Sequence, residues 1–403
     1  MNDAFIYDAI RSPRGKGKKD GSLNELSAAK LSSIVLKALR KRNNLDTFHL
    51  SDVIWGNATQ VAEQGGCLSR SALLLADYEE SVPGLSINRF CASGLEAVNL
   101  AANQIIAGEG YAYVSGGVEM MSRVPMGSDG AAIAVDPELT MKEYFIPQGI
   151  SADLIATKYK FSRNDVDSFA VESQKRAFNA SKNNYFSKSM IPINDQNGIL
   201  ILDKDEIIRP DTDLKALSNL NPSFKEMGEN LPGFDKVALL RFPEYEKINH
   251  IHHAGNSSGI VDGAASVLVG SKKLESFIQK KPKVKILATQ KIGCNPTMML
   301  NGPVPVTKEI LKKANMKISD IDIFEVNEAF ASIVLMFMSE FNIPHDKINV
   351  NGGAIAMGHP LGATGAIILG SAIDELERRD KHTALITLCV ASGMGVATII
   401  ERV

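Results

Sequence analysis

The stretch "INRFCASGLEAVNL", residues 87–100, decides the fold class, because an apolar strand-like run changes there into a helical pattern. Cys91 lies at the change, and apolar residues then recur at helical spacing up to Gly108: Leu95, Val98, Ala102 and Ile105. The following "YAYVSGG" (111–117) predicts a strand that ends in a glycine turn. Short runs rich in Val and Ile alternate with helical patterns in this way along the chain, which indicates an α/β fold.

The order of elements around Cys91 recurs near the C-terminus. The matching pairs are "SDVIWGNA" (51–58) with "SDIDIFEVNEA" (319–329), "INRFCASG" (87–94) with "VNGGAIAMGHPLGATG" (350–365), and "YVSGGVEM" (113–120) with "LCVASGMG" (388–395). We therefore expect two similar halves. Corresponding turns would face each other across a pseudo-twofold axis, where they could share one site.

Between the two halves the sequence changes character. Residues 121–250 are richer in Met, Pro, Asn and charged residues, so we predict an inserted loop domain that binds substrate and covers the site. Residues 1–120 and 251–275 would form the N-terminal half. Residues 276–403 would form the C-terminal half, with its first strand near Lys283.

Composition excludes several classes of protein. The 403 residues are 44% apolar and 22% charged with a net charge of −2, which is typical of a globular protein. The basic cluster "RSPRGKGKK" (11–19) is short and is interpreted as a solvated loop, so no nucleic acid partner is expected. The sequence has neither a long uncharged apolar run nor a signal-like N-terminus, which predicts a cytoplasmic protein that does not bind membranes.

Several common motifs fail in detail. The four cysteines, Cys67, Cys91, Cys294 and Cys389, form no CxxC pair, and the histidines His250, His252 and His253 lack an acidic or Cys partner at motif spacing. We therefore expect no metal. Residues 353–358 have P-loop spacing, but His359 replaces the lysine, and the chain has no GxSxG nucleophile elbow.

Three side chains remain as candidates for chemistry, although each alone could be a packing residue. Cys91 precedes a helix, where free N–H groups and the helix dipole favour a thiolate and lower the pKa. Cys389 closes the apolar strand "ALITLCV" (384–390), and strand ends in α/β folds face crevices. His359, in "GHPLGATG" (358–365), occupies an exposed turn position that would present its imidazole.

Together these side chains suit a two-stage acyl transfer through a thioester. One cysteine would be the nucleophile, His359 its base, and the second cysteine a separate acid or base. Asn327 could hold a water or a carbonyl oxygen. Backbone N–H groups of the glycine turns could form oxyanion holes.

The sequence resembles the thiolase family, the β-ketoacyl-CoA thiolases and acetyl-CoA acetyltransferases, along essentially its whole length. The segments that carry the resemblance are "DAIRSPRGK" (8–16), "NRFCASGLEAV" (88–98), "AGNSSGIVDGAA" (254–265), "EVNEAFA" (325–331), "NGGAIAMGHPLGATGA" (351–366) and "LCVASGMG" (388–395). The resemblance implies two βαβαβαββ halves in five αβαβα layers, with a loop domain above the active site. It also implies a homodimer or homotetramer that uses coenzyme A and acyl-CoA as substrates and binds no permanent cofactor.

By the same resemblance, Cys91 takes the acyl group as a thioester after His359 accepts its proton. Cys389 exchanges a proton with the α-carbon of acetyl-CoA. Asn327 anchors a water that, with His359, stabilises the enolate oxygen.

The remaining roles concern oxyanion and coenzyme A binding. The resemblance implies that the backbone N–H groups of Cys91 and Ala391 hold the oxyanion of the tetrahedral intermediate. Ser258 would contact pantetheine, and Arg209 in "IIRPDT" (207–212) would lie near the adenine.

The chain departs from the family pattern in three places. Ala391 and Ser392 stand where glycines are usual. Pro147 and Gln148 replace a His-Met pair that short-chain, acetoacetyl-specific thiolases often carry. An extra segment, residues 229–248, separates the middle of the chain from "AGNSSG".

We expect a coenzyme A-dependent β-ketothiolase, with degradative 3-ketoacyl-CoA thiolysis favoured over a biosynthetic, acetoacetyl-CoA-specific acetyl-CoA C-acetyltransferase. A decarboxylating β-ketoacyl synthase would use two histidines, whereas Asn327 and Cys389 stand in their places. A thiolase-like acyl-CoA or lipid carrier without turnover is the alternative from a different class.

Overall fold

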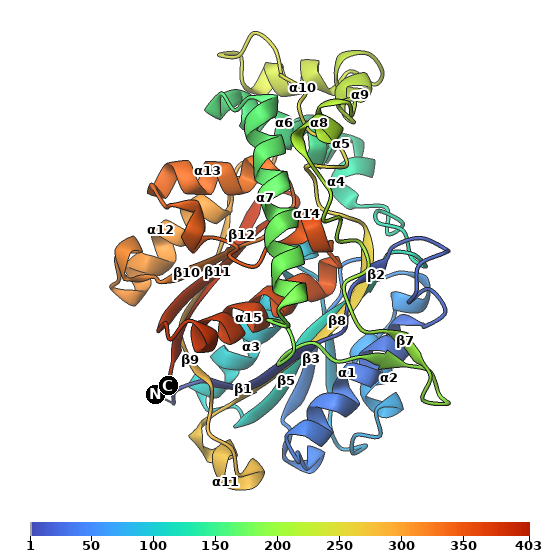
Figure 1. Cartoon of the computed structure of the whole chain (residues 1–403), viewed down its shortest axis with the longest axis vertical. Coiled ribbons are helices and arrows are strands. Elements are labelled where there is room, and N and C mark those ends of the chain that lie inside the picture. Colours follow the sequence, from blue (N-terminus) through green and yellow to red (C-terminus); the bar gives the residue numbers. More distant parts are fainter. Residues whose placement is uncertain (1) are drawn as a thin grey trace.

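Two similar groups of strands form the centre of the molecule in the computed structural model, which describes residues 2–403 (Figure 1). The first group has the order β4-β3-β5-β8-β1 and the second the order β10-β11-β12-β9. The strands of the first group are β1 (Phe5–Arg11), β3 (Asp52–Gly56), β4 (Gly84–Ile87), β5 (Ala112–Met120) and β8 (Val261–Gly270), with β2 (Gly15–Lys16) paired to β8. The second group comprises β9 (Val284–Gly293), β10 (Ile323–Val326), β11 (Thr383–Val390) and β12 (Met394–Arg402).

The two groups share one pattern of pairing. β3 pairs with β5 in parallel and β10 with β11 in parallel, while β5–β8 and β11–β12 are both antiparallel. The parallel β3–β4 pairing has its counterpart in a single parallel bridge between Phe324 and Ile348. The predicted internal repeat is therefore confirmed, and β3, β5 and β8 correspond to β10, β11 and β12.

Helices and strands alternate in five layers. The central layer contains α3 (Ser93–Ala107) and α15 (Leu361–Arg378), whose apolar side chains share one buried cluster with strands of both groups. The outer layers contain α1 (Ala28–Arg42) and α2 (Leu68–Leu75) on one side, and α12 (Pro303–Ala314) and α13 (Ala331–Phe341) on the other (Figure 1). The expected five-layer αβαβα architecture is confirmed.

Glycines allow the two central helices to approach each other closely. A Cβ atom at Gly94 of α3 would lie 2.7 Å from the Gly362 carbonyl oxygen of α15. A Cβ at Gly117 would meet the same carbonyl. The prediction of a glycine turn at residues 116–117 is therefore wrong: β5 continues to Met120, and its glycine makes room for the start of α15.

Only a short contact joins the two groups of strands into one sheet. β1 pairs with β9 through Phe5–Lys285 and Ile6–Val284 alone. The remaining strand pairs of each half lie within that half. The halves are thus held together mainly by the central helix layer.

The chain between β5 and β8 places α6, α8, α9 and α10 at the top of Figure 1, while α7 runs down over the layers and β7 lies beside α1 and α2. It contains α4 (Ala132–Val135), α5 (Pro137–Lys142), α6 (Gln148–Tyr159), α7 (Arg163–Lys182), α8 (Leu214–Ser218), α9 (Lys225–Glu229), α10 (Phe234–Arg241) and the small sheet of β6 (Ile193–Asn194) and β7 (Leu200–Leu202). α6 packs in one apolar cluster with α12 and α13. The extra segment 229–248 forms α10 and its flanking turns. Short helices elsewhere are α11 (Glu275–Ile278) and α14 (Ala354–Met357).

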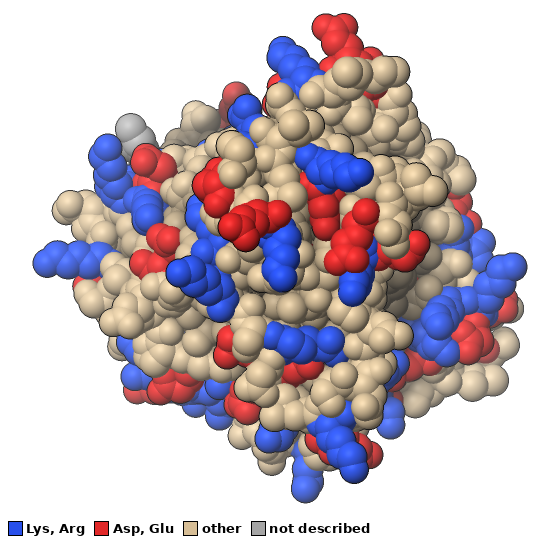
Figure 2. All heavy atoms as spheres, turned by 90° about the horizontal axis from the view of Figure 1, so that it is seen from above, with Lys and Arg blue, Asp and Glu red and all other residues tan. Residues whose placement is uncertain are grey.

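The surface around this end carries charges of both signs. In Figure 2, which views the molecule from above, basic and acidic residues are interspersed over the visible face. None of the helices described between residues 2 and 403 combines the length and apolar character needed to cross a bilayer.

Candidate active site

Cys91 lies in a short 3₁₀ turn (Phe90–Ala92) that leads directly into α3. Ser93 fixes this turn, since its Oγ accepts a hydrogen bond from the Arg89 N–H at 2.8 Å and donates to the Phe90 carbonyl at 2.7 Å. Phe90 adopts a φ of 45°, a costly conformation for an aromatic residue immediately before the candidate nucleophile. The local backbone is thus held in a strained form that presents Cys91.

The environment of Cys91 is apolar. The side chain is 4% exposed and packs with Ala58, Met121 and Leu361. Burial raises the pKa of the thiol to about 12, although the N–H groups of Cys91 and Ala391 act in the opposite direction. The expectation of a lowered pKa is therefore wrong, because desolvation outweighs the helix N-terminus.

His359 lies between α14 and α15 and is also buried, at 4% exposure, so the predicted exposed turn is wrong. Its Nδ1 is 2.6 Å from Thr364 Oγ1, and that hydroxyl donates to the Pro360 carbonyl at 2.9 Å. Because the hydroxyl proton is committed to Pro360, Nδ1 is the protonated ring nitrogen and Nε2 carries the lone pair. Burial lowers the pKa of His359 to about 3, and the nearby Arg14 guanidinium acts in the same direction.

Asn327 faces the basic nitrogen of His359. It follows the C-terminal end of β10, where its backbone N–H donates to the Thr387 carbonyl at 3.0 Å. Its Nδ2 lies 3.3 Å from His359 Nε2. Its Oδ1 is buried without a hydrogen-bond partner among residues 2–403, so it is available to a water or a substrate hydroxyl.

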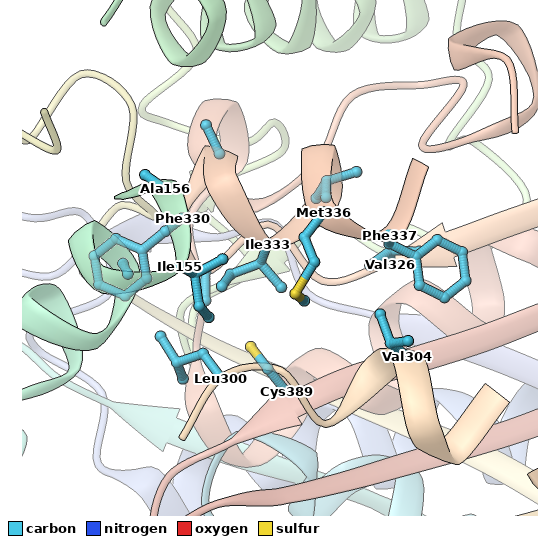
Figure 3. Close-up of a cluster of buried hydrophobic side chains, with 14 of the residues drawn as sticks. Ile155, Ala156, Leu300, Val304, Val326, Phe330, Ile333, Met336, Phe337 and Cys389 are labelled. Carbon is cyan, nitrogen blue, oxygen red and sulfur yellow. The ribbon is translucent and has the colours of Figure 1, made fainter. Parts of the chain in front are cut away.

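Cys389 approaches the same centre from β11. It is fully buried at the edge of an apolar cluster, near Leu300 and Ile155 (Figure 3). Burial raises its pKa well above the usual value, and the next cause is the charge of Cys91. The two sulfur atoms are therefore close enough for their charges to interact.

The turn between β11 and β12 supplies a backbone donor. The Ala391 N–H lies near the thiol of Cys91 and lowers its pKa against the effect of burial. Ser392 (φ 61°) and Gly393 (φ 75°) adopt the left-handed conformation in this turn, whereas Ala391 does not. A Cβ at Ala391 is therefore tolerated, and its N–H remains directed at Cys91.

The loop that carries Ser258 lies against this centre. The Ser258 N–H donates to the Ala329 carbonyl at 2.9 Å, and the His359 N–H donates to the Gly259 carbonyl at 2.9 Å. Ser258 itself is partly exposed. The loop is thus fixed both to the start of α13 and to the candidate base.

Arg209 lies outside this centre. It is exposed and borders a cavity of about 540 Å³ lined by Ile208, Arg209, Pro210, Asp211, Thr212, Ala216, Leu217 and Leu220. Ile207, two residues earlier, packs against Gly259 of the Ser258 loop. The chain therefore leads from the cavity to the loop, although Arg209 does not contact the sulfur centre.

Sequence reasoning missed three supporting residues. Thr364 lies in the same motif as His359, so a hydroxyl one helical turn later was the available signal. Glu119 accepts hydrogen bonds from the N–H groups of Ala58 and Gly362, each at 2.9 Å, and so joins the first half to the start of α15. Nothing in the local pattern marked this carboxylate.

The third residue is Arg14, in the basic cluster that was interpreted as a solvated loop. That interpretation is wrong for Arg11 and Arg14, which are each 2% exposed. Arg11 forms a bidentate pair with Asp205, with both N–O distances at 2.8 Å. Asp205 lies 194 residues further along the chain, so the composition of the basic cluster could not show that Arg11 and Arg14 are buried.

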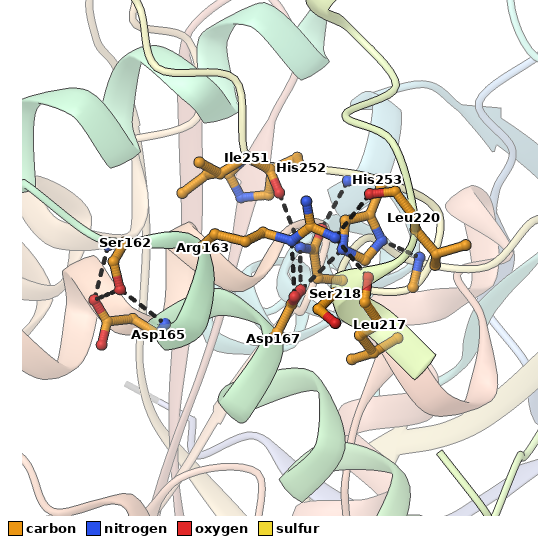
Figure 4. A network of polar contacts seen from close by, with 12 residues as sticks. Ser162, Arg163, Asp165, Asp167, Leu217, Ser218, Leu220, Ile251, His252 and His253 are labelled. Carbon is orange, nitrogen blue, oxygen red and sulfur yellow. Dashed lines mark hydrogen bonds and ion pairs between the residues drawn. The ribbon is translucent and has the colours of Figure 1, made fainter. Parts of the chain in front are cut away.

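The adjacent histidines also have acidic partners from distant helices. Figure 4 shows Asp167 of α7 bonded to His253 Nε2 at 2.9 Å and to Arg163 Nε at 2.7 Å. The Gly255 N–H donates to His253 Nδ1 at 3.0 Å, so the ring donates from Nε2 to Asp167. Across residues 2–403, no group of three or more His, Cys, Asp or Glu residues is placed to hold a metal ion.

Comparisons with known proteins agree with this architecture and site. Residues 4–233 match the thiolase N-terminal domain and residues 280–402 the thiolase C-terminal domain. The chain therefore belongs to the thiolase family.

Named relatives cover the whole chain. It is 37% identical to the 3-ketoacyl-CoA thiolase FadA of Escherichia coli K12, and this match covers 100% of both proteins. The 3-ketoacyl-CoA thiolase of Shigella boydii is likewise 37% identical with 100% coverage of both. Among solved structures, human mitochondrial 3-ketoacyl-CoA thiolase is 31% identical and the Bacillus anthracis acetyl-CoA acetyltransferase 30% identical. Each superposes with a TM-score of 0.86, covering 100% of this chain and 99% of the other.

Proposed function

We propose that the protein is a 3-ketoacyl-CoA thiolase, which cleaves 3-ketoacyl-CoA with coenzyme A into a shortened acyl-CoA and acetyl-CoA in a reversible reaction. The observation that supports this proposal is a chain of buried contacts: Cys91 packs against Leu361, two residues after His359, and the His359 ring faces Asn327. Cys91 also affects the pKa of Cys389. Relatives named 3-ketoacyl-CoA thiolase that match the whole chain support the degradative direction. Fatty acid β-oxidation is the corresponding process.

In the first stage, His359 Nε2 accepts the proton of Cys91 and the sulfur attacks the 3-keto carbonyl carbon. The backbone N–H groups of Cys91 and Ala391 hold the oxyanion that forms. Cleavage of the bond between C2 and C3 leaves the acyl group on Cys91 and an acetyl-CoA enolate. The imidazolium of His359 and a water on Asn327 stabilise the enolate oxygen while Cys389 donates a proton to its carbon.

In the second stage, coenzyme A releases the acyl group. Its thiol proton passes to the deprotonated Cys389, and its sulfur attacks the thioester carbonyl. Collapse of the intermediate expels Cys91 sulfur, which recovers its proton from His359. Atoms and protons balance, and the enzyme returns to its starting state.

The assignment of the two cysteines is tested by trapping. Incubation with an acyl-CoA followed by peptide mapping is expected to place a thioester on Cys91. Cys389→Ala is expected to retain this acylation but to lose exchange of deuterium into acetyl-CoA. A thioester on Cys389, or unchanged exchange in the variant, would refute the assignment.

The acyl chain is proposed to be longer than acetoacetyl. Cys389 borders an apolar cluster built by α6, α12 and α13, so this wall of the centre favours methylene groups over polar ones. Pro147 and Gln148 lie at the start of α6, in place of the His-Met pair of acetoacetyl-specific enzymes. Rates of thiolysis and condensation against chain length test this point. A rate confined to acetoacetyl-CoA would favour the biosynthetic acetyl-CoA C-acetyltransferase, the activity named for the Bacillus anthracis neighbour.

We propose that coenzyme A binds along the Ser258 loop and the Arg209 cavity. Ser258 would contact pantetheine, and Arg209 would bind near the adenine at its cavity. Coenzyme A and acyl-CoA act as substrates, with no permanently bound cofactor or metal. Arg209→Ala is expected to raise KM for coenzyme A thioesters while kcat stays constant.

We also infer a homodimer or homotetramer in the cytoplasm. β4 is an edge strand of the sheet, and it leads directly to Cys91. The neighbouring Leu74, Leu75 and Leu85 are exposed large apolar residues, which suits burial against a second copy. Sedimentation velocity is expected to give a dimer or larger species, and a Leu85→Asp variant is expected to dissociate it.

A further inference from the structure

His250 lies between two carboxylates. Its Nδ1 is 2.8 Å from Asp153 Oδ2, and its Nε2 is 2.9 Å from Asp235 Oδ2. Its side chain is 2% exposed. Asp153 belongs to α6, whereas Asp235 belongs to α10, the helix of the extra segment 229–248. His250 therefore joins the extra segment to the rest of the molecule.

This geometry determines the protonation state of the ring. A carboxylate oxygen only accepts, so each ring nitrogen must donate, and a neutral imidazole has only one N–H. His250 therefore satisfies both contacts as an imidazolium. Burial, the largest single cause, lowers its pKa, but the ring's hydrogen bonds to Asp153 and Asp235 and the charges of these carboxylates together outweigh burial and raise it.

The contact is tightly enclosed by α9. A Cβ at Gly228 would lie 2.7 Å from His250 Cε1 and 2.8 Å from Nε2, so only glycine fits over the ring. α10 also packs Phe234, Val237, Ala238 and Leu239 against the apolar cluster of α6, α12 and α13, while Asp235 is its buried polar residue and Leu240 is 72% exposed. Asp235 is thus the main polar anchor of α10.

The same anchor reaches the Ser258 loop. Asp153 Oδ1 accepts the N–H groups of Ile251 at 3.0 Å and His252 at 3.1 Å, as well as His252 Nδ1 at 2.7 Å. These residues lead into the loop that carries Ser258. One buried carboxylate therefore connects α10, through His250, to the segment that enters this loop.

We propose that His250 is a positioning residue: as an imidazolium it fastens α10 to α6 and steadies the approach to the coenzyme A loop, and loss of one proton releases α10. The part that concerns coenzyme A binding rests on the proposed function. The fastening of α10 does not.

The charged groups around His250 come from every neighbouring element. α6 supplies Asp153, α10 supplies Asp235, and α9 supplies Lys225, Glu226 and Glu229. The irregular segment around His250 supplies Lys247 and His252, which shares Asp153. Asp153 and Asp235 alone bond to the ring. Because its folded pKa is raised, the stabilisation by His250 is complete at low pH and is lost as pH rises through that pKa. Asp235 lies nearer the surface, at 12% exposure, so its contact opens first.

Hydrogen–deuterium exchange of peptides within residues 229–248 tests the fastening. After correction for intrinsic rates, we expect exchange to be about tenfold faster at about pH 9 than at about pH 6. Asp235→Asn is expected to exchange rapidly at both pH values. Glu246→Gln removes an exposed charge from the same segment and is expected to behave as the unmodified protein. Equal exchange at both pH values in the unmodified protein would overturn the proposal.

A second measurement follows the ring directly and does not need a variant. The ¹⁵N shifts of His250 are expected to report two protonated nitrogens at about pH 6 and one at about pH 9. A neutral ring at the lower pH would also refute the fastening.

The proposed effect on coenzyme A binding is tested by measuring KM and kcat separately. Asp235→Asn is expected to raise KM for coenzyme A about threefold or more with kcat unchanged. An unchanged KM would overturn the link to the loop even where exchange confirms the fastening. A protein without thiolase activity would refute the proposed function and leave the exchange result valid.

Discussion

Cys91 and His359 are both uncharged in the resting site. Burial raises the pKa of the thiol to about 12 and lowers that of the imidazole to about 3. A resting thiolate–imidazolium pair would need both charges in an apolar enclosure, which costs desolvation energy. The proton therefore moves only when the substrate carbonyl is attacked.

This pairing predicts an unusual pH profile for alkylation of Cys91 by iodoacetamide. The pair keeps the same number of protons between about pH 3 and about pH 12, so the rate in the unmodified protein is expected to be flat between about pH 6 and pH 9. In His359→Ala only the thiolate reacts, so the rate should rise about tenfold per pH unit without a plateau. A rising profile in the unmodified protein would contradict proton transfer to His359.

Thr364 is expected to act through the tautomer of His359. Thr364→Val removes the hydroxyl that accepts from Nδ1, which frees the ring to protonate Nε2 instead. Acylation of Cys91 should fall about 100-fold with little change in KM. Thr364→Ser keeps the hydroxyl and is expected to restore the rate, and the ¹⁵N shifts of His359 report the tautomer. A Val variant with unchanged acylation would show that Nδ1 needs no acceptor.

Residue identities at the candidate site could be read from the sequence, whereas their environments could not. Cys91, His359, Cys389 and Asn327 stand at strand ends and turns, where local pattern is informative. Their burial comes from partners far along the chain, such as Leu361 beside Cys91. That is why the thiol was expected to be acidic and the imidazole exposed.

Among the elements, α3 and α15 depend on glycine at their contact. Their first turns cross so closely that backbone meets backbone, as Gly94 and Gly362 show. Close approach brings Cys91 and His359, at the starts of the two helices, to one place. Small residues here therefore serve the site as well as packing.

A pair of substitutions on α15 tests this view. A Cβ at Gly365 would lie 2.6 Å from Leu95 Cβ, so Gly365→Ala is expected to destabilise the fold by about 2 kcal/mol or more. Gly370 is the matched control on the same helix, because a Cβ there meets only Ala9 Cβ at 3.4 Å. Gly370→Ala should be neutral or stabilising by about 0.5–1 kcal/mol. Urea unfolding measures both, and equal effects would argue against the close contact.

Local patterns predicted several elements, including α3 with its cap at Gly108 and the strand β8. The turn predicted at Gly116 and Gly117 was wrong for a physical reason. In the sequence, a glycine that makes room for a neighbouring helix cannot be distinguished from a glycine that allows a turn. The sequence left the structure of residues 229–248 open, because the partners of α10, which are the apolar cluster and His250, come from other parts of the chain. The contact of α10 with His250 links residues that no local pattern relates.

For the molecule as a whole, buried carboxylates make stability depend on pH. Burial raises the pKa of Asp374 on α15 to about 6, partly opposed by a hydrogen bond from Ser189. A raised carboxyl pKa stabilises the fold at low pH, and this contribution is lost as pH rises from about 4 through about 6. Asp374 thus favours stability at mildly acidic pH, whereas the lowered pKa values of the buried Asp153, Asp167 and Asp205 favour stability at higher pH.

Asp374→Asn is expected to remove this dependence. Relative to the unmodified protein, its free energy of unfolding should rise by up to about 3 kcal/mol between about pH 4 and pH 7.5. Chemical denaturation at the two pH values measures the difference. Asp203→Asn, at an exposed position, is the control and should show none. A constant difference for Asp374→Asn would mean that Asp374 titrates normally.

The meeting of β1 with β9 has a consequence for chain connectivity. β12 pairs Arg402 with Val284, and Val284 pairs with Ile6, so the beginning and end of the chain lie side by side (Figure 1). A short linker could close the chain into a ring, and the exposed stretch Lys280–Lys281 before β9 could be opened instead. Such a circular permutant would run from the second half into the first with every layer preserved. The fold therefore does not require that the first half precede the second half along the chain.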